Sequence, residues 1–294
     1  MGVNAVRRTK RHFWLSLIVA LLATPATHVA AVRAETLVPA EHHEWGRFPS
    51  GSWKRVRLTS EKLDRDGQVI SKNVSETTTT LVSVEDGSAT LRVDSVVDVA
   101  GRQFAKQPQL VSQGFNGEVA ATPVVSNEKV DQLGTDVVTI AGQRFNSEVR
   151  GYSCLANSHR WSTRVYYSSN VAPYVLRREI RWQDSGGQRT LYETVVEVTA
   201  VDVPEQVKGK PRLVSHVQTT HVTPGGKTIT KEVRCEEVPG GNVAHTSQEF
   251  DKDGVLVGRS TLELVDYYVP SAPAAERNPS QQSWPQWRYR RWSR

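Results

Sequence analysis

The sequence predicts an all-β protein of antiparallel strands with at most one short helix. From Val137 to Val203, apolar and aromatic residues alternate with polar ones in the runs VVTIAGQRFNSEV, RVYYSSNVAPYVLRREIRW and TLYETVVEVTAVDV. A period of two is typical of strands that bury one face, and almost no helical period accompanies it. Turn sequences then recur, the last three at intervals of roughly 10 to 16 residues, which suits antiparallel hairpins better than parallel βαβ units. They are Asp184–Gly187, Pro224–Gly226, Pro239–Gly241 and Asp253–Gly254.

The first 34 residues have the pattern of a secretory signal peptide. Four basic residues between positions 7 and 11 precede an apolar run from Phe13 to Ala23. Val-Arg-Ala at 32–34 is the preferred cleavage site, with Val-Ala-Ala at 29–31 as the alternative. The apolar run is short for a membrane span, although a retained anchor stays as a second interpretation. We therefore expect an exported protein, periplasmic or secreted, after cleavage near Ala34.

The net charge of the chain is concentrated at its two ends. The formal charge is +6, but the first 34 residues hold five basic side chains and no acidic one, so the remainder carries only +1. Residues 270–294 contribute +4, which leaves −3 for residues 35–269. A body of this charge does not describe a basic nucleic-acid-binding protein, and we expect no nucleic-acid partner.

Composition divides the exported part into three segments. Residues 35–51 are polar and irregular, and we interpret them as a lead-in segment. Residues 52–269 form the antiparallel β domain, either as one unit or as two lobes, 52–133 and 134–269. After Val269 the composition shifts to Pro, Ser, Gln, Trp and Arg, so residues 270–294 are expected to be a disordered tail.

An internal repeat predicts two related hairpins. Val96–Phe104, VVDVAGRQF, recurs as Val137–Phe145, VVTIAGQRF, with the apolar strand, the Ala-Gly turn, the polar pair and the Phe in matching positions. No third copy follows, which argues against a solenoid or propeller. Between the two copies, Ser126–Gly134 could form the one short helix, with Ser126 as its cap and Gly134 as its stop.

One strand face in the central stretch is predicted to point to the interior and line a cavity. Its residues are Tyr174, Leu176, Arg178, Ile180 and Trp182. Because a buried arginine is costly unless paired, Arg178 is expected to meet a carboxylate or to reach the rim of a cavity. The alternative is a strand that twists near a sheet edge and exposes Arg178.

Cys154 and Cys235 are the only cysteines, and both lie in the exported part. In an oxidising compartment they could form one disulfide that closes a loop of about 80 residues. Geometry decides whether such a bond forms, so a bridge and two free thiols stay as alternatives.

Three segments resemble exported bacterial β-proteins of the periplasmic lipoprotein-carrier (LolA-like) half-barrel type. They are Gly142-x-x-Phe145, Val165-Tyr-Tyr-Ser and VAPYVLRRE at 171–179, within about residues 137–203. The resemblance implies a strongly curved antiparallel sheet, a half-barrel or open barrel, whose concave face holds an acyl chain or a protein segment. Proteins of this type have no catalytic residues to transfer. The chain departs from them because it lacks the several helices that plug those half-barrels.

No motif for catalysis or cofactor binding is complete in the chain. Gly-x-Ser-x-Gly, the P-loop, Gly-x-Gly-x-x-Gly and His-Glu-x-x-His are all missing. We therefore predict no enzyme, no catalytic residue, no cofactor and no metal. His42 and His43, flanked by Glu41 and Glu44, could hold a metal weakly, but a solvated loop is the preferred interpretation.

The tail is the candidate for surface attachment. Three tryptophans alternate with four arginines in it: Trp284, Trp287, Arg288, Arg290, Arg291, Trp292 and Arg294. Indole rings favour the headgroup depth of a membrane, where arginines pair with phosphates. A solvated tail without a partner is the alternative.

The function predicted from these features is an exported, non-catalytic binding protein whose ligand is lipid-like or a protein of the envelope. The alternative is an architectural cell-envelope protein, in which the sheet is a scaffold and the basic aromatic tail attaches to an anionic surface. A cavity on the concave face would favour the first function.

Overall fold

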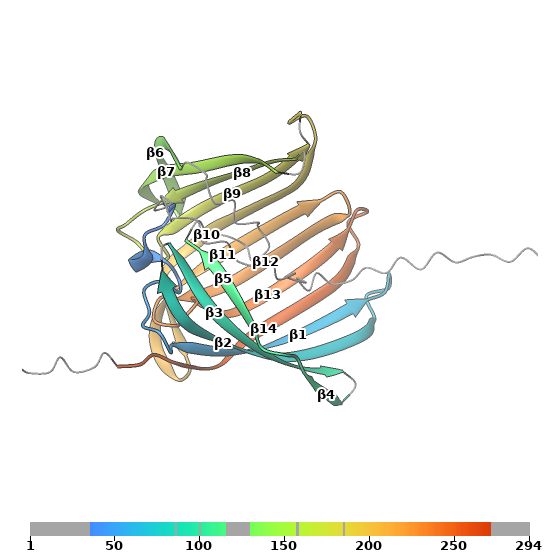
Figure 1. Ribbon diagram of the computed structural model, residues 1–294. Helices are drawn as coiled ribbons and strands as arrows, with labels where there is room; N and C mark the ends of the chain where they lie inside the picture. Colours follow the sequence, from blue (N-terminus) through green and yellow to red (C-terminus); the bar gives the residue numbers. More distant parts are fainter. Residues whose placement is uncertain are drawn as a thin grey trace, which may run out of the picture.

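The computed structural model describes residues 36–85, 87–99, 101–115, 130–156, 159–184 and 186–271. In this part of the chain one sheet contains fourteen strands, and the pairs are antiparallel. The order along the sheet is β4-β3-β2-β1-β14-β13-β12-β11-β10-β9-β8-β7-β6, and β5 pairs with β3 beside β4 (Figure 1). The predicted all-β antiparallel fold class is confirmed.

The strand bounds, in chain order, are β1 (Trp53–Leu63), β2 (Val69–Glu85), β3 (Ser88–Val99), β4 (Arg102–Ala105), β5 (Gln109–Gly114), β6 (Asp131–Ile140), β7 (Gln143–Ala156), β8 (His159–Tyr167), β9 (Val175–Asp184), β10 (Thr190–Val207), β11 (Lys210–Thr223), β12 (Gly226–Cys235), β13 (Asn242–Asp251) and β14 (Leu256–Tyr268).

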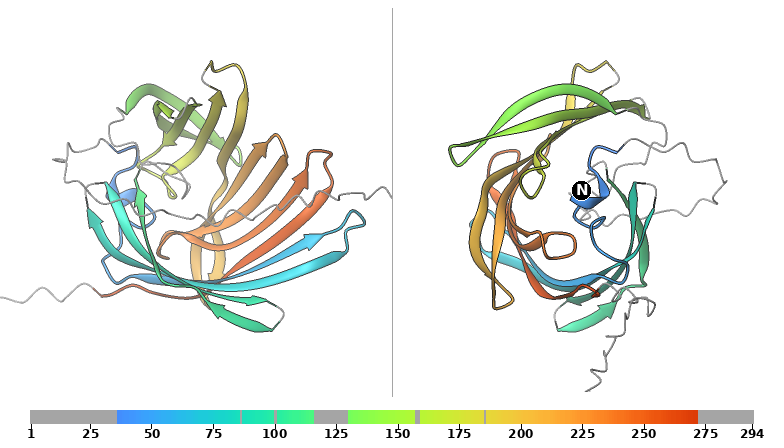
Figure 2. Two further views of the ribbon diagram at one scale, coloured as in Figure 1. Left: turned by 45° about the vertical axis from the view of Figure 1, so that its right-hand side comes forward. Right: turned by 90° about the vertical axis from the view of Figure 1, so that its left-hand side faces the viewer.

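The sheet is long, curved and open. Figure 2 shows it bent into a trough, with β4 and β5 at one edge and β6 at the other. Strands β1 and β14, from opposite ends of the described chain, pair from Trp53–Tyr268 to Lys62–Gly258. One sheet therefore holds the strands of both predicted lobes. Its curvature confirms, at the level of fold, the resemblance to exported half-barrel proteins.

The repeated sequence forms two hairpins of the same register, as predicted. Val97 pairs with Phe104 between β3 and β4, and Val138 pairs with Phe145 between β6 and β7. In the second turn Ala141 and Gly142 have φ angles of 48° and 85°. Positive φ at both central residues is the geometry of a tight type I′ hairpin.

The lead-in segment lies inside the trough (Figure 2). It contains one 3-10 turn, η1 (Ala40–His42). Leu37 and Val38 pack with Tyr152, Val165 and Tyr167 on one side of the trough. Trp45 packs with Leu81, Leu91 and Phe115 on the other side. The lead-in thus occupies part of the trough and joins its two walls.

Two sequence-based interpretations are wrong. Leu37, Val38 and Trp45 are 0%, 2% and 3% exposed, and His43 between them is 5% exposed, so the segment around His42 and His43 is not a solvated loop. Where the structure describes the predicted helix at 126–134, it finds β6, which begins at Asp131. That strand forms because β7 supplies backbone hydrogen-bond partners along the hairpin as far as the Asp131–Gly151 pair. Gly134, which was predicted to end a helix, lies within this strand.

No helix within the described ranges is both long and apolar enough to span a membrane. The predicted signal peptide and tail, residues 1–34 and 272–294, lie outside the described residues.

Candidate functional site: a cavity on the concave face

A cavity of about 760 Å³ lies between the lead-in segment and strands β9 to β12. Its size falls in the range of roughly 300–1,000 Å³ that is typical of small-molecule sites. Its lining residues are Val38, His42, His43, Glu44, Arg47, Gln113, Ala172, Pro173, Val175, Arg178, Val196, Asp202, Pro204, Pro211, Arg212, Leu213, Val214, Ser215, Val217, Thr219, Glu232, Arg234, Cys235, Glu236, Glu237 and Gly241.

Part of the strand side of the cavity is apolar, and Arg178 lies beside this apolar part. Val196 on β10 pairs with Thr219 on β11, and Val217 lies two residues before Thr219 on the same strand face. Pro173 and Val175 extend this wall from the start of β9. The period of two sends the intervening residues to the convex face, where Arg177 pairs with Glu179 at 3.0 Å and with Glu197 at 3.5 Å.

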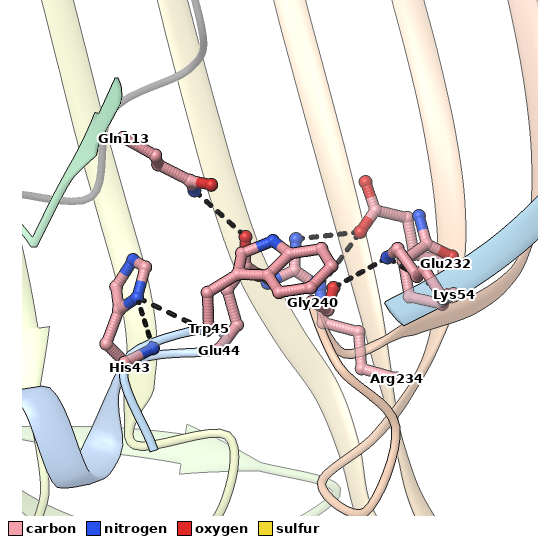
Figure 3. A network of polar contacts seen from close by, with 10 residues as sticks. His43, Glu44, Trp45, Lys54, Gln113, Glu232, Arg234 and Gly240 are labelled. Carbon is pink, nitrogen blue, oxygen red and sulfur yellow. Dashed lines mark hydrogen bonds and ion pairs between the residues drawn. The ribbon is translucent and has the colours of Figure 1, made fainter. Parts of the chain in front are cut away.

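One end of the cavity is lined by coupled charges (Figure 3). Arg234 lies 2.8 Å from Glu232 and 3.5 Å from Glu44. Gln113 Nε2 donates a hydrogen bond to Glu44 Oε1 at 3.1 Å. Burial is the largest single influence on Glu44 and opposes its ionisation, but Arg234, His43, Lys54 and the hydrogen bond from Gln113 together outweigh it, so the pKa of this carboxyl lies below its usual value. The side chains of Arg234 and Glu44 are 29% and 30% exposed because they face the cavity.

Lys54 and a glycine turn hold the lead-in at this charged end. Lys54 Nζ donates to the Gly240 carbonyl at 3.0 Å and lies 5.7 Å from the centre of the Trp45 ring. Gly240 N in turn donates to the Glu44 carbonyl at 2.8 Å. Burial lowers the pKa of Lys54 to about 8. A Cβ at Gly240 would lie 2.7 Å from Trp45, so only glycine fits this close approach.

His43 is a neutral acceptor beneath the cavity. Its Nδ1 accepts hydrogen bonds from Trp45 N at 3.2 Å and from Gly46 N at 3.1 Å. Burial lowers its pKa to about 4. Near pH 7 the ring is therefore uncharged, with its proton on Nε2.

A second cluster closes the cavity beside Tyr174. The Tyr174 hydroxyl donates to Glu236, which also pairs with Arg47 at 2.8 Å. The Tyr174 ring stacks on His42 with 4.0 Å between ring centres. Burial, with Glu236, raises the pKa of Tyr174. These contacts tie the turn before β9 and the turn after β12 to the lead-in.

The residues predicted to line a cavity take different places. Arg178 lines the main cavity, and Leu176 lines a second one of about 490 Å³ near β6. Ile180 is buried, Trp182 contacts Trp161 and Tyr192, and Tyr174 packs on the lead-in. Arg178 pairs in register with Val196 inside the sheet, so β9 is not an edge strand.

The sequence analysis missed the lead-in side of the cavity. His43, Glu44 and Arg47 come from a segment interpreted as irregular, and Arg234 and Glu232 come from a strand to which no site was assigned. The available signal was the group Leu37, Val38 and Trp45, whose apolar side chains in a short polar segment require a partner surface.

The disulfide alternative is wrong. Cys154 pairs with Trp161 on β8, and this row of paired residues continues through Trp182 to Tyr192 on β10. Cys235 pairs with Val214 on β11, and that row reaches Val203 on β10. Tyr192 and Val203 are separated by roughly 30 Å of extended strand. A disulfide requires Cα atoms within about 7 Å. Cys235 has a free, buried thiol, and burial raises its pKa.

Within the described residues, no group of three or more His, Cys, Asp or Glu side chains is placed to hold a metal ion. His42 bonds to the Tyr167 hydroxyl, the nitrogen of His43 accepts from the backbone, and the carboxylate of Glu44 accepts from Gln113. The tail residues from Trp284 to Arg294 lie outside the described part of the chain.

No family model and no curated protein matches the sequence. Among solved structures, the chain is similar to a candidate exported protein with a YmcC-like fold from Bacteroides fragilis, at 8% identity and a TM-score of 0.29 over 74% of this chain and 98% of that one. It is also similar to a candidate lipoprotein from Parabacteroides distasonis, at 10% identity and a TM-score of 0.28 over 75% and 97%. A third similar structure is the MucA/MucB complex of Pseudomonas aeruginosa, at 12% identity and a TM-score of 0.16 over 79% and 96%.

Proposed function

We propose that the protein is an exported, non-catalytic binding protein that holds a single-chain, lipid-like amphiphile in the concave cavity. The observation that carries the proposal is a cavity of about 760 Å³ with an apolar strand wall and a charged end. Val196, Val217 and Val175 offer the apolar chain a dry surface, and Arg234 lies where a polar head can reach it. Burying each methylene contributes roughly 0.8 kcal/mol, so a chain of ten supplies about 8 kcal/mol before the costs of binding.

The chemistry of the wall supports binding rather than catalysis. Of the carboxylates that line the cavity, Glu232, Glu44 and Glu236 are engaged by Arg234 and Arg47, and Glu237 is paired with Arg212. Cys235, the thiol on the wall, has a raised pKa, whereas a nucleophilic cysteine needs a lowered one.

The test compares two adjacent threonines of β11. Thr219 lines the cavity, and Thr220 points to the opposite face of the same strand; both are half-buried. We expect Thr219→Trp to fill the cavity and weaken binding of cis-parinaric acid, a fluorescent fatty acid, by about tenfold or more, while Thr220→Trp binds like the wild type. Equal binding by the two variants, or no binding by the wild type, would contradict the proposal.

A segment of an envelope protein is the second candidate ligand, because the trough already accommodates a peptide. The lead-in buries Leu37 and Val38 against its wall and bonds through its backbone to the Phe115 carbonyl. If this candidate is right, hydrophobic peptides will bind to the wild type and more weakly to Thr219→Trp. Fatty acids will not compete with this peptide binding.

The architectural function stays as a proposal for the tail. The basic, tryptophan-rich residues 270–294 would then attach the protein to an anionic membrane or envelope surface. This attachment is compatible with ligand binding in the cavity, and a separate vesicle experiment tests it.

A further inference from the structure

A row of aromatic rings crosses the concave face next to the cavity. Trp161 on β8, Trp182 on β9 and Tyr192 on β10 pair in register, and His221 on β11 continues the row. The ring centres are 5.4 Å apart from Trp161 to Trp182, 5.5 Å from Trp182 to Tyr192 and 6.1 Å from Tyr192 to His221. Four adjacent strands thus supply one continuous line of rings.

Tyr192, the third ring of this row, is accessible to solvent. Tyr192 is 42% exposed, and its ring is within 10° of parallel to the His221 ring. Tyr192 and His221 lie on the same strand faces as Val196 and Thr219 of the cavity wall, displaced along their strands toward the other end. The rings therefore form a surface beside the cavity, and the row of hydroxyl residues that adjoins them shares only Thr219 with the cavity wall.

A row of hydroxyl groups adjoins the rings. Thr219, Thr230, Ser247, Ser260 and Ser60 pair in register across β11, β12, β13, β14 and β1. All five are half-buried. Thr230 and Ser247 share a hydrogen bond of 2.9 Å, and Thr194 Oγ1 bonds to His221 Nδ1 at 2.7 Å. Hydroxyls both donate and accept, so the row can follow a ligand with many hydroxyl groups.

The charge of the two rows limits the class of ligand. None of the four ring residues or five hydroxyl residues is acidic or a lysine or arginine, and burial lowers the pKa of His221, which keeps its ring neutral near pH 7. The convex face of the same strands instead carries ion pairs, such as Arg181–Glu193 at 2.8 Å. Glu232 and Glu249 flank Thr230 and Ser247 on the same strand faces, and Glu232 is paired with Arg234. The residues of the two rows themselves offer neither a counter-ion nor a repelling charge, which suits an uncharged ligand.

We propose that these two rows bind an uncharged carbohydrate. The apolar C–H face of a pyranose ring would pack on Tyr192 and His221, and its hydroxyls would bond to Thr219, Thr230 and Ser247. Flat rings combined with neutral hydrogen-bonding groups suit this chemistry better than a charged headgroup or an acyl chain, which would leave the hydroxyl row without partners.

The test uses uncharged hexasaccharides of glucose, mannose and N-acetylglucosamine as probes, measured by calorimetry and saturation-transfer NMR. Wild type should bind at least one of them, and Tyr192→Ala should weaken that binding by about fivefold or more through loss of the ring contact. Tyr192→Phe should retain it. Tyr268→Ala is the matched control, because Tyr268 is 52% exposed at the end of β14, away from the row.

Three outcomes would overturn the proposal. They are no binding of any probe by the wild type, equal binding by Tyr192→Ala, and binding that disappears between about 0.05 and 0.5 M salt, which would mark a charged ligand. Binding of cis-parinaric acid by Tyr192→Ala should remain at the wild-type level. That measurement separates failure of this proposal from failure of the amphiphile site, and it also shows that the variant is folded.

Discussion

At the scale of single residues, the lead-in depends on His43 remaining neutral. Its Nδ1 satisfies two backbone N–H groups, and a protonated ring could not accept either hydrogen bond. The centre of its ring lies 4.4 Å from the centre of the Phe115 ring, and His43 is only 5% exposed. The histidine therefore links the local backbone of residues 43–46 to the packing of the trough.

This arrangement predicts that stability falls on acidification. The pKa of His43 is about 4 in the folded protein and near 6.5 when unfolded. Between these values the unfolded chain binds more protons, so stability is complete above pH 6.5 and is lost as the pH falls toward 4, by about 3 kcal/mol in total. Urea unfolding at a series of pH values measures this loss.

The matched variant is His43→Asn, whose Oδ1 can accept the same two N–H groups without titrating in this range. We expect a shallower loss of stability below pH 6.5 than in the wild type. Part of the slope should remain, because burial also lowers the pKa of His221 and His245. Identical slopes for variant and wild type would show that His43 is not the group responsible.

At the scale of elements, the lead-in and the turn after β12 form one unit. Gly240 has a φ angle of 69°, and its N–H donates a hydrogen bond to the Glu44 carbonyl. A Cβ at this position would collide with the Trp45 ring. Both conditions point to glycine, one through the backbone and one through packing. The charged end of the cavity is assembled where these two segments meet.

Gly240→Ala should therefore destabilise the protein more than a glycine change at an open turn. Gly254→Ala is the control, since Gly254 has a φ of 81° and a Cβ at this position would meet nothing within 4 Å. Strain at positive φ costs about 1 kcal/mol in both variants, and overpacking against Trp45 should add roughly 1–3 kcal/mol at Gly240. Equal losses in urea unfolding would mean that the lead-in does not press on this turn.

The strands could be predicted from the sequence better than the contacts between distant segments. Two features depend only on neighbouring residues and can be recognised in the sequence. They are the period of two around Leu176 and Ile180 and the Ala-Gly turn at 141–142. The docking of Trp45 on Leu81 and Phe115 joins segments far apart in sequence, and no local pattern encodes such a partner. The cavity depends on that docking, and for this reason the lead-in half of it was missed.

At the scale of the whole molecule, charge separates the body from its ends. Residues 35–269 carry −3, and the 25 residues that follow carry +4. Each arginine near an anionic membrane contributes about 1 kcal/mol. A chain of residues 35–294 should therefore bind anionic vesicles at low salt, and a chain of residues 35–269 should not.

Salt provides the control for this attachment. The Debye length falls from about 10 Å at 0.1 M to about 3 Å at 1 M, so high salt should release the chain of residues 35–294. Vesicle co-sedimentation measures both effects. Equal binding by the two chains would remove the tail from the mechanism, and binding by neither would leave it without this function.

The central claim, that the concave cavity holds a single-chain amphiphile, is tested most directly by locating the ligand. A fatty acid carrying a diazirine at the end of its chain can be bound, photoactivated and traced by mass spectrometry of the digested protein. We predict cross-links to the cavity-wall residues Val196, Val214 and Val217, and their loss in Thr219→Trp but not in Thr220→Trp. Cross-links confined to the convex face, or spread evenly over the sheet, would contradict the account.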